Sequence, residues 1–240
     1  MDEKIFMARV AEQAERFEDM VSFLKDMLKE KKGELSVEER NLLSVGFKNL
    51  IGSKRTAIRT IAAIEQNPKY QKFNDAMGNY KKKIEDELFA QCEDIVKTIK
   101  EMALPNANEG ESKAFFLKMI GDYYRYIAEN ASGDRLKQVS DGALESYQQA
   151  SEVCEKELGA CNPTRLGLAL NFSVFHFEVM NNNKKACELA EQALNDALAK
   201  IDECDEEQFR DAKSIIELLK ENLSLWKEEE DGGEKGVEDL

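Results

Sequence analysis

Residues 41–64 read NLLSVGFKNLIGSKRTAIRTIAAI, a helical pattern that carries only positive charge. The four basic residues are Lys48, Lys54, Arg55 and Arg59, and the stretch contains no Asp or Glu. Residues seven apart on an α-helix lie about 20° apart around its axis and roughly 10 Å apart along it, which aligns Lys48 with Arg55. Arg59 extends this basic stripe by one turn. The stretch therefore predicts a long helix with one basic face.

The basic stripe contrasts with the charge of the whole chain. The chain has 240 residues, with 48 Asp and Glu against 34 Lys and Arg, and its formal net charge is -14. Such a charge repels nucleic acids and anionic membranes, so we expect neither as a partner and no membrane insertion. A small local anion is the better ligand for the stripe.

A second basic element lies in LKMIGDYYRYIAE, residues 117–129, where Tyr126 follows Arg125 directly and Lys118 lies two turns earlier. Guanidinium groups match phosphate oxygens bidentately, an ammonium adds a point charge, and a phenol donates one more hydrogen bond. Together with the basic stripe, this element predicts a phosphate receptor. Asp122 and Glu129 share a helix side with Arg125 and either orient its guanidinium or form simple surface pairs.

Helical periodicity continues along the whole chain, and no segment alternates apolar and polar residues long enough to predict a strand. Short connections favour antiparallel neighbours. We predict an all-α fold of nine antiparallel helices, at residues 3–15, 18–31, 37–66, 70–103, 111–130, 134–158, 164–180, 183–200 and 206–227. Ser36 followed by Glu39 is a capping-box pattern at the start of the third helix. We expect one helical domain over residues 1–227 and a disordered acidic tail over residues 228–240.

Several classes of protein are disfavoured by composition. The five cysteines have no CxxC spacing and only His176 could join them as a nitrogen ligand, so neither a zinc site nor a disulfide framework is indicated. We expect no metal and no cofactor. No apolar run is long enough to span a membrane, and MDEKIFMARVAEQ lacks the apolar core of a signal peptide. The expected location is the cytoplasm, with the nucleus as a second compartment.

Five segments resemble, in order and spacing, the 14-3-3 phosphoserine/phosphothreonine adaptor proteins. They are NLLSVGFKN (41–49), GSKRTAIR (52–59), ALPNANEGESKAFFLKMIGDYYRYIAE (103–129), NPTRLGLALNFSVFHFE (162–178) and LLKENLSLW (218–226). This resemblance implies a cup-shaped, homodimeric protein that binds phosphorylated segments of client proteins in an amphipathic groove, regulates their activity, location or assembly, and catalyses no reaction. Pairing with a paralogue is a further possibility.

The resemblance also implies residue roles. Lys48, Arg55, Arg125 and Tyr126 match the family's phosphate ligands. Residues at helical spacing form the opposite wall, where Asn171 and Asn222 interrupt apolar faces and match the family's clamps on the peptide backbone. The full set of expected peptide contacts is Arg59, Lys118, Gly167, Leu170, Asn171, Val174, Glu178, Ile215, Leu218, Asn222, Leu225 and Trp226.

A dimer interface is implied at the first two helices and the fourth. Arg16 with Glu87, and Asp19 with Lys72, match the family's cross-subunit ion pairs. Exposed pairs contribute little individually, so apolar side chains are expected to contribute more. The expected interface residues are Ile5, Val10, Arg16, Phe17, Asp19, Lys72, Tyr80 and Glu87.

Three positions depart from the family's pattern. Ser214 stands where members commonly carry leucine, and Ile120 stands where they often have lysine, so peptide preference beside the phosphate is expected to differ. Ala57 replaces a serine whose modification loosens the dimer in many members, and that switch is expected to be absent.

Three other interpretations compete with the adaptor. ALESYQQASEVCEKELGACNPTRLGLALNFSVF suggests a helical-repeat peptide binder, but no regular repeat continues along the chain. A scaffold or chaperone for unphosphorylated clients would differ in being independent of the phosphate. An enzyme is disfavoured, because His176 lies in an aromatic face and no nucleophile with a supporting base is recognisable.

Overall fold

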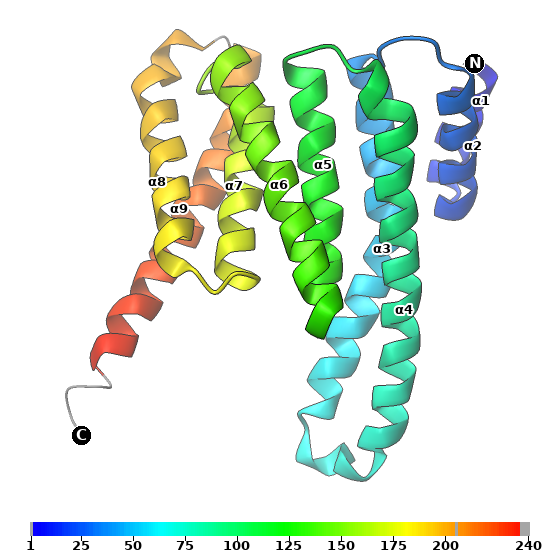
Figure 1. Cartoon of the computed structure of the whole chain (residues 1–240), viewed down its shortest axis with the longest axis vertical. Helices are drawn as coiled ribbons and strands as arrows, with labels where there is room; N and C mark the ends of the chain where they lie inside the picture. Colours follow the sequence, from blue (N-terminus) through cyan, green and yellow to red (C-terminus); the bar gives the residue numbers. More distant parts are fainter. Residues whose placement is uncertain (1, 205, 236–240) are drawn as a thin grey trace. The chain divides into compact units, whose positions relative to one another are not determined.

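The computed structural model describes residues 2–204 and 206–235. Within these residues the chain forms nine α-helices and no β-strand, which confirms the predicted all-α fold (Figure 1). The chain divides into two compact units, Met1–Ala107 and Asn108–Leu240. The single domain expected over residues 1–227 therefore stays a prediction.

The first unit contains four α-helices: α1 (Asp2–Gln13), α2 (Phe17–Glu30), α3 (Val37–Glu65) and α4 (Asn74–Thr98). Each helix packs against the next, and α3 and α4 form a long antiparallel pair (Figure 1). Side chains of α2, α3 and α4, such as Leu24, Phe47 and Leu88, are fully buried between them. This core fixes which face of α3 is left for solvent.

The start of α3 follows the predicted capping box. The Glu39 backbone N–H donates to the Ser36 hydroxyl at 3.2 Å, and the Ser36 backbone N–H donates to the Glu39 carboxylate at 2.8 Å. Lys31 also donates to this carboxylate, at 2.9 Å. Because these bonds satisfy donors that a helix start leaves open, they set where α3 begins.

The helix expected over residues 70–103 is a more complex segment. A 3-10 helix at Pro68–Phe73 precedes α4, and a π-helical turn at Ile99–Ala103 and a short 3-10 helix at Leu104–Asn106 follow it. Proline lacks a backbone N–H and its ring clashes with the preceding turn, so Pro105 cannot continue the α-helical pattern. The continuous helix predicted there was therefore wrong at both ends.

The second unit contains five α-helices: α5 (Glu111–Ala128), α6 (Gly133–Glu157), α7 (Pro163–Glu178), α8 (Asn183–Lys200) and α9 (Glu206–Lys235). Consecutive helices pack against each other, and α7 also packs against both α5 and α9 (Figure 1). The amide side chain of Asn162 caps α7 by accepting from the backbone N–H groups of Thr164 and Arg165. Helix α7 is thus the central element of this unit.

An aromatic cluster forms the core beside α7. The ring of Tyr147 stacks on that of Phe172 with centroids 5.2 Å apart, and it also contacts Phe175. Tyr147 can reach this position because Gly121 has no side chain, since a Cβ there would lie 2.7 Å from the Tyr147 ring. The contact brings α6 close to α5.

Helix α9 ends later than expected. The sequence predicted an end at residue 227, whereas the helix continues to Lys235. Lys and Glu have favourable helix propensities, so KEEED favours continuation of the helix beyond residue 227. Of the predicted disordered tail, residues 236–240 lie outside the described residues. Among those that are described, no helix has the length and apolarity needed to span a membrane.

Candidate functional site

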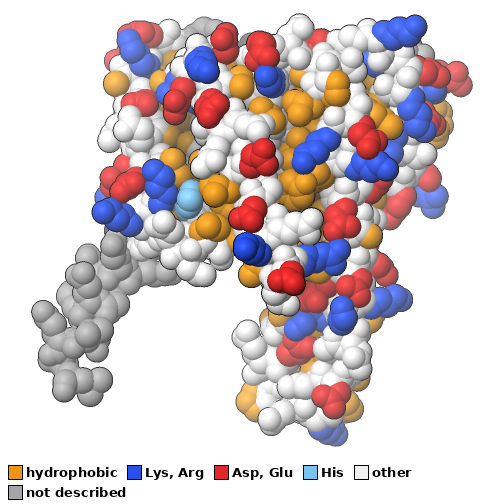
Figure 2. All heavy atoms as spheres, in the orientation of Figure 1, with side chains coloured by type: hydrophobic (Ala, Val, Ile, Leu, Met, Phe, Trp, Pro, Cys, Tyr) orange, Lys and Arg blue, Asp and Glu red, His pale blue; other side chains and the backbone are white. Residues whose placement is uncertain are grey.

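The basic stripe lies on α3, in the first unit. Lys48 and Arg59 are exposed, and Arg55 is half-buried. All three belong to one continuous helix, so their spacing places them on one face of it. Lys54 lies about 120° around the helix from Lys48, on a different face. Acidic and basic side chains elsewhere are intermixed on the surface drawn in Figure 2.

Arg125 lies on α5, in the second unit, and is buried, with 6% of its surface exposed. Its Nη1 donates to the Glu129 carboxylate at 2.9 Å and lies 4.0 Å from that of Glu178. Its Nε donates to the Tyr147 hydroxyl at 3.4 Å, and its guanidinium carbon lies 4.7 Å from the centre of the Tyr126 ring. Neighbours on α5, α6 and α7 therefore hold this guanidinium in place.

Asp122 is the centre of a buried hydrogen-bond network. Its Oδ2 accepts from Lys118 Nζ at 2.7 Å, while its Oδ1 accepts from the Tyr147 hydroxyl at 2.7 Å and from Asn171 Nδ2 at 2.8 Å. Burial favours the neutral acid, but the charges of Lys118 and Arg125 and these hydrogen bonds outweigh it and lower the pKa of Asp122. The carboxylate is therefore ionised, and it fixes one predicted peptide contact from α5 and one from α7.

Burial also affects the pKa values of Tyr147 and Arg125, which both interact with Asp122. Burial, followed by the negative charge of Asp122, raises the pKa of Tyr147 well above its usual value, so the phenol keeps its proton. For Arg125, burial opposes the charged form, but the negative charges of Asp122 and Glu129 help to outweigh it and the pKa is raised. The site thus has a fixed cation, a fixed anion and a neutral phenol between them.

The two expectations for the acids beside Arg125 have different outcomes. Glu129 bonds the guanidinium directly, as one of the two alternatives proposed. Asp122 acts on Arg125 through the hydroxyl of Tyr147 instead. Sequence reasoning missed Tyr147 altogether. It lies 25 residues from Asp122 on another helix, and in ALESYQQA nothing except its helical position marks it as buried.

The expected peptide wall lies on α7 and α9, which pack together in the second unit. Asn171 and Asn222 are half-buried, whereas Leu218 and Leu225 are 47% and 59% exposed. Exposed leucines beside amides give the wall the amphipathic character that was predicted. The remaining members are half-buried, except for the exposed Glu178: Gly167, Leu170, Val174 and Ile215.

Trp226 differs from the other members of this set in its burial. Its side chain is buried, and its ring stacks on that of Phe177 with centroids 5.0 Å apart and 20° between planes. Its backbone carbonyl accepts from the Asn183 amide at 3.1 Å. The indole therefore packs between α7 and α9, and its role as a peptide contact stays a prediction.

The three residues that depart from the family pattern differ in how exposed they are. Ile120 is buried, with 1% of its surface exposed, whereas Ser214 is exposed on α9. An altered preference beside the phosphate therefore rests on Ser214 rather than on Ile120. Ala57 is half-buried on α3.

The residues expected at a dimer interface all lie in the first unit. Ile5 and Phe17 are half-buried, and Val10 and Tyr80 are 43% and 59% exposed. Lys72 and Glu87 are also exposed. Phe6, which sequence reasoning did not single out, is 64% exposed on α1. These side chains give α1 and α4 exposed apolar surface, which a dimer interface could bury.

Two residues of the ion pairs expected across the dimer, Arg16 and Asp19, already pair with each other within one chain. Within one chain, Arg16 pairs with Asp19 at 2.7 Å, three residues along the sequence. Arg16 with Glu87 and Asp19 with Lys72 stay predictions, and each would have to replace or share this pair.

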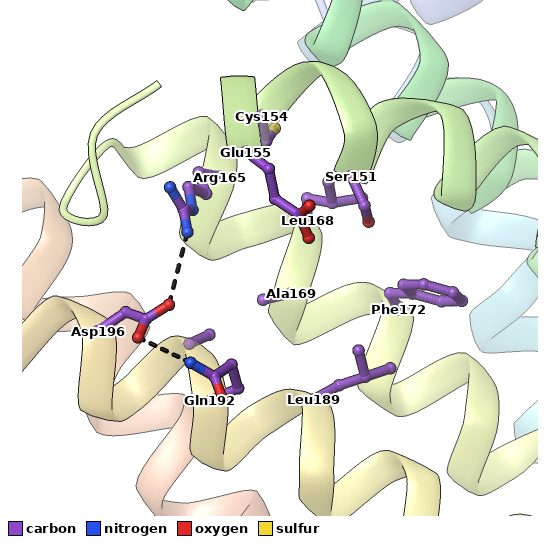
Figure 3. A pocket seen from close by; sticks show the side chains of 11 residues that line it. Ser151, Cys154, Glu155, Arg165, Leu168, Ala169, Phe172, Leu189, Gln192 and Asp196 are labelled. Carbon is purple, nitrogen blue, oxygen red and sulfur yellow. Dashed lines mark hydrogen bonds and ion pairs between the residues drawn. The ribbon is translucent and has the colours of Figure 1, made fainter. Parts of the chain in front are cut away.

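A pocket of about 110 Å³ lies in the second unit (Figure 3). Its lining combines the Arg165–Asp196 ion pair with apolar side chains such as Leu168, Phe172 and Leu189. At about 100° per residue, its α7 residues lie roughly opposite those of the peptide wall. The pocket is therefore separate from the predicted site. No cluster of His, Cys, Asp and Glu suited to a metal occurs among the residues described.

Comparison with known proteins identifies a family. The family model described as "14-3-3 protein" matches residues 7–227. The chain is 47% identical over 225 residues to "14-3-3 protein 3" of Entamoeba histolytica, covering 92% of this chain and 93% of the relative. It is 45% identical over 240 residues to "14-3-3-like protein C" of Glycine max (98% and 92% covered) and over 233 residues to "14-3-3 protein beta/alpha" of Homo sapiens (97% and 94% covered).

Proposed function

Because this chain belongs to the 14-3-3 family, we propose that it is a non-catalytic adaptor that binds phosphoserine- or phosphothreonine-containing segments of client proteins. The observation that carries the proposal is the acid-free basic stripe on α3, with Lys48, Arg55 and Arg59 on one side of a long helix in an acidic chain. A dianionic phosphate is the ligand that such a stripe suits best.

The proposed phosphate ligands are Lys48 and Arg55 from the first unit and Arg125 and Tyr126 from the second. Hydrogen bonds to a charged group contribute roughly 1.5–3 kcal/mol each, so three or four could supply most of the ~8 kcal/mol of micromolar binding. Arg125 needs little reordering on binding, because Glu129 and Tyr147 already hold its guanidinium. A preorganised cation of this kind favours recognition of a specific group over diffuse attraction.

The amides of Asn171 and Asn222 are proposed to hold the backbone of the bound segment. Each amide offers both donors and an acceptor, so it can pair with a peptide group whatever the side chain. The bond from Asn171 to Asp122 engages Nδ2 and leaves Oδ1 to accept from the peptide. Leu218 and Leu225 provide exposed apolar surface beside these amides.

We further propose a homodimer, with pairing to a paralogue as an alternative assembly. Two linked binding sites convert a second binding event into an intramolecular one, with gains in avidity of about 10²–10⁴. A dimer could thereby regulate the activity, location or assembly of a client. The proposed place of action is the cytoplasm, with the nucleus as a second compartment.

The deciding experiment is fluorescence anisotropy with a labelled peptide of the form Arg-Ser-x-phosphoSer-x-Pro and its unphosphorylated twin. Wild type should bind the phosphorylated peptide at micromolar concentration or tighter and the twin far more weakly. Lys48→Glu should abolish binding, because it reverses a charge at the proposed phosphate site.

Lys54→Glu is the matched control. It makes the same change of charge on the same helix but on another face, so it should keep most of the affinity. Circular dichroism should show that both variants stay helical. Equal binding of both peptides would instead support a scaffold or chaperone for unphosphorylated clients. Equal losses of affinity in both lysine variants would mean that α3 attracts the peptide by its overall charge and not through a site at Lys48.

A further inference from the structure

Two cysteine thiols donate to backbone carbonyls in the last turn of α8. Cys161 lies in the loop before α7, and Cys204 follows the short 3-10 helix Ile201–Glu203 after α8. The Cys161 thiol donates to the carbonyl oxygen of Ala197 at 3.4 Å, and the Cys204 thiol donates to that of Lys200 at 3.4 Å. These carbonyls are three residues apart on one helix, hence neighbours on its surface.

The two residues also share one packing environment. Cys161 lies in the apolar cluster formed by α7, α8 and α9, and Cys204 packs against that cluster. Their loops lie at the same end of the second unit (Figure 1). The other three cysteines, Cys92, Cys154 and Cys187, are buried within α4, α6 and α8.

We propose that Cys161 and Cys204 are a redox-modification site, at which a peroxide converts the two thiols into one disulfide that joins the start of α7 to the start of α9. Disulfides in reducing compartments are typically transient and redox-sensing, which suits two free thiols held at neighbouring carbonyls of one helix end. The proposal is independent of phosphopeptide binding, because it concerns covalent chemistry at the far end of α8.

The positions of the two sulfurs assign the order of the steps. Cys204 is partly exposed, so its thiolate attacks the peroxide oxygen; the O–O bond breaks, water leaves and Cys204 becomes a sulfenic acid. Cys161 then attacks the Cys204 sulfur, the S–O bond breaks and a second water leaves. Two thiols are oxidised while one hydrogen peroxide is reduced to two waters.

Burial explains why Cys161 reacts second, with the sulfenic acid, and not first, with the peroxide. Burial, together with the neighbouring Cys204, raises the pKa of Cys161 to about 12, so little thiolate is available for a direct attack on peroxide. Once Cys204 is a sulfenic acid, the placement of both side chains at the last turn of α8 compensates for this weak ionisation.

The disulfide would close a loop over residues 161–204 that contains all of α7 and α8. Cross-links of this kind stabilise chiefly by restricting the unfolded chain. For a loop of this length we expect the oxidised protein to melt roughly 10 °C higher than the reduced protein.

The test uses the full chain, reduced, desalted and treated with hydrogen peroxide in slight excess over protein. Trypsin cleaves after Lys156, Arg165, Lys200 and Arg210, so the two cysteines leave on separate peptides, 157–165 and 201–210, unless they are joined. Non-reducing mass spectrometry should find these two peptides linked within one chain, with two hydrogen atoms lost, and dithiothreitol should release them.

Cys204→Ser and Cys161→Ala should each abolish the link and the rise in melting temperature, while Cys187→Ser should keep both. In Cys161→Ala, peroxide should leave Cys204 as a sulfenic acid that a dimedone probe captures, a readout that needs only a folded chain. A link between two chains, a link to another cysteine, or two free thiols after treatment would overturn the proposal.

Discussion

The hydroxyl of Tyr147 donates to Asp122 at 2.7 Å in the interior of the second unit, and the same oxygen accepts from Arg125 Nε at 3.4 Å. One phenol therefore connects a buried anion to a buried cation. Because both charges lie away from water, loss of this bridge removes one hydrogen bond from each and leaves them only their other partners, such as Lys118 for Asp122 and Glu129 for Arg125. The arrangement links the stability of the unit to the orientation of its proposed phosphate ligand.

Tyr147→Phe should therefore destabilise the protein by about 1–3 kcal/mol, since it removes the hydroxyl but keeps the ring against Phe172 and Phe175. Urea unfolding followed by circular dichroism measures the loss. Tyr70→Phe is the control, because that phenol is 36% exposed in the first unit and should change stability by less than about 0.5 kcal/mol. Equal effects at the two positions would mean that the bridge contributes nothing.

Two glycines offer a matched pair of substitutions. A Cβ at Gly121 would lie 2.7 Å from the Tyr147 ring, so Gly121→Ala should cost about 1–3 kcal/mol by forcing α5 and α6 apart. A Cβ at Gly52, inside α3, would meet nothing within 4 Å, so Gly52→Ala should stabilise by about 0.5–1 kcal/mol. Thermal or urea unfolding should give opposite signs for the two variants. Two changes of the same sign would refute this account of the α5–α6 contact.

The proposed dimer is testable at Tyr80, whose ring is 59% exposed on α4. Tyr80→Glu would place a charge in the apolar surface that dimerisation should bury, so it should shift the particle mass in light scattering from the dimer toward 27.3 kDa. Leu225→Glu is the control, since Leu225 is equally exposed but lies on α9, outside the expected interface. Wild type that is already monomeric at micromolar concentration would rule out the dimer.

The fold was largely predictable because helical periodicity and caps are local properties of the sequence. Ser36 and Glu39 form the expected box, and the spacing of Lys48 and Arg55 placed them on one helix face. The errors concern tertiary environment. Aromatic character did not reveal that Tyr147 is buried beside Asp122, or that Trp226 stacks on Phe177. Both depend on contacts between helices that are distant in sequence.

His176 provides a pH dependence that can be assigned to one residue, because it is the only histidine of the chain. Its ring is buried between Phe172 and Phe175, and its Nδ1 has no hydrogen-bond partner among the described residues. Burial first, and the charge of Lys185 second, lower its pKa from the ordinary value of 6.5. The folded protein therefore binds this proton less readily than the unfolded chain does.

It follows that His176 lowers stability as the pH falls below 6.5, because the unfolded chain then takes up a proton that the folded state resists. His176→Phe keeps an aromatic ring and removes the titration. The difference in unfolding free energy between wild type and variant should be constant from pH 7.5 to 8.5 and should move against wild type between pH 6.5 and 5.5. Carboxylates titrate in both proteins and cancel in the difference. Parallel curves over the whole range would mean that the folded and unfolded chains bind this proton equally well.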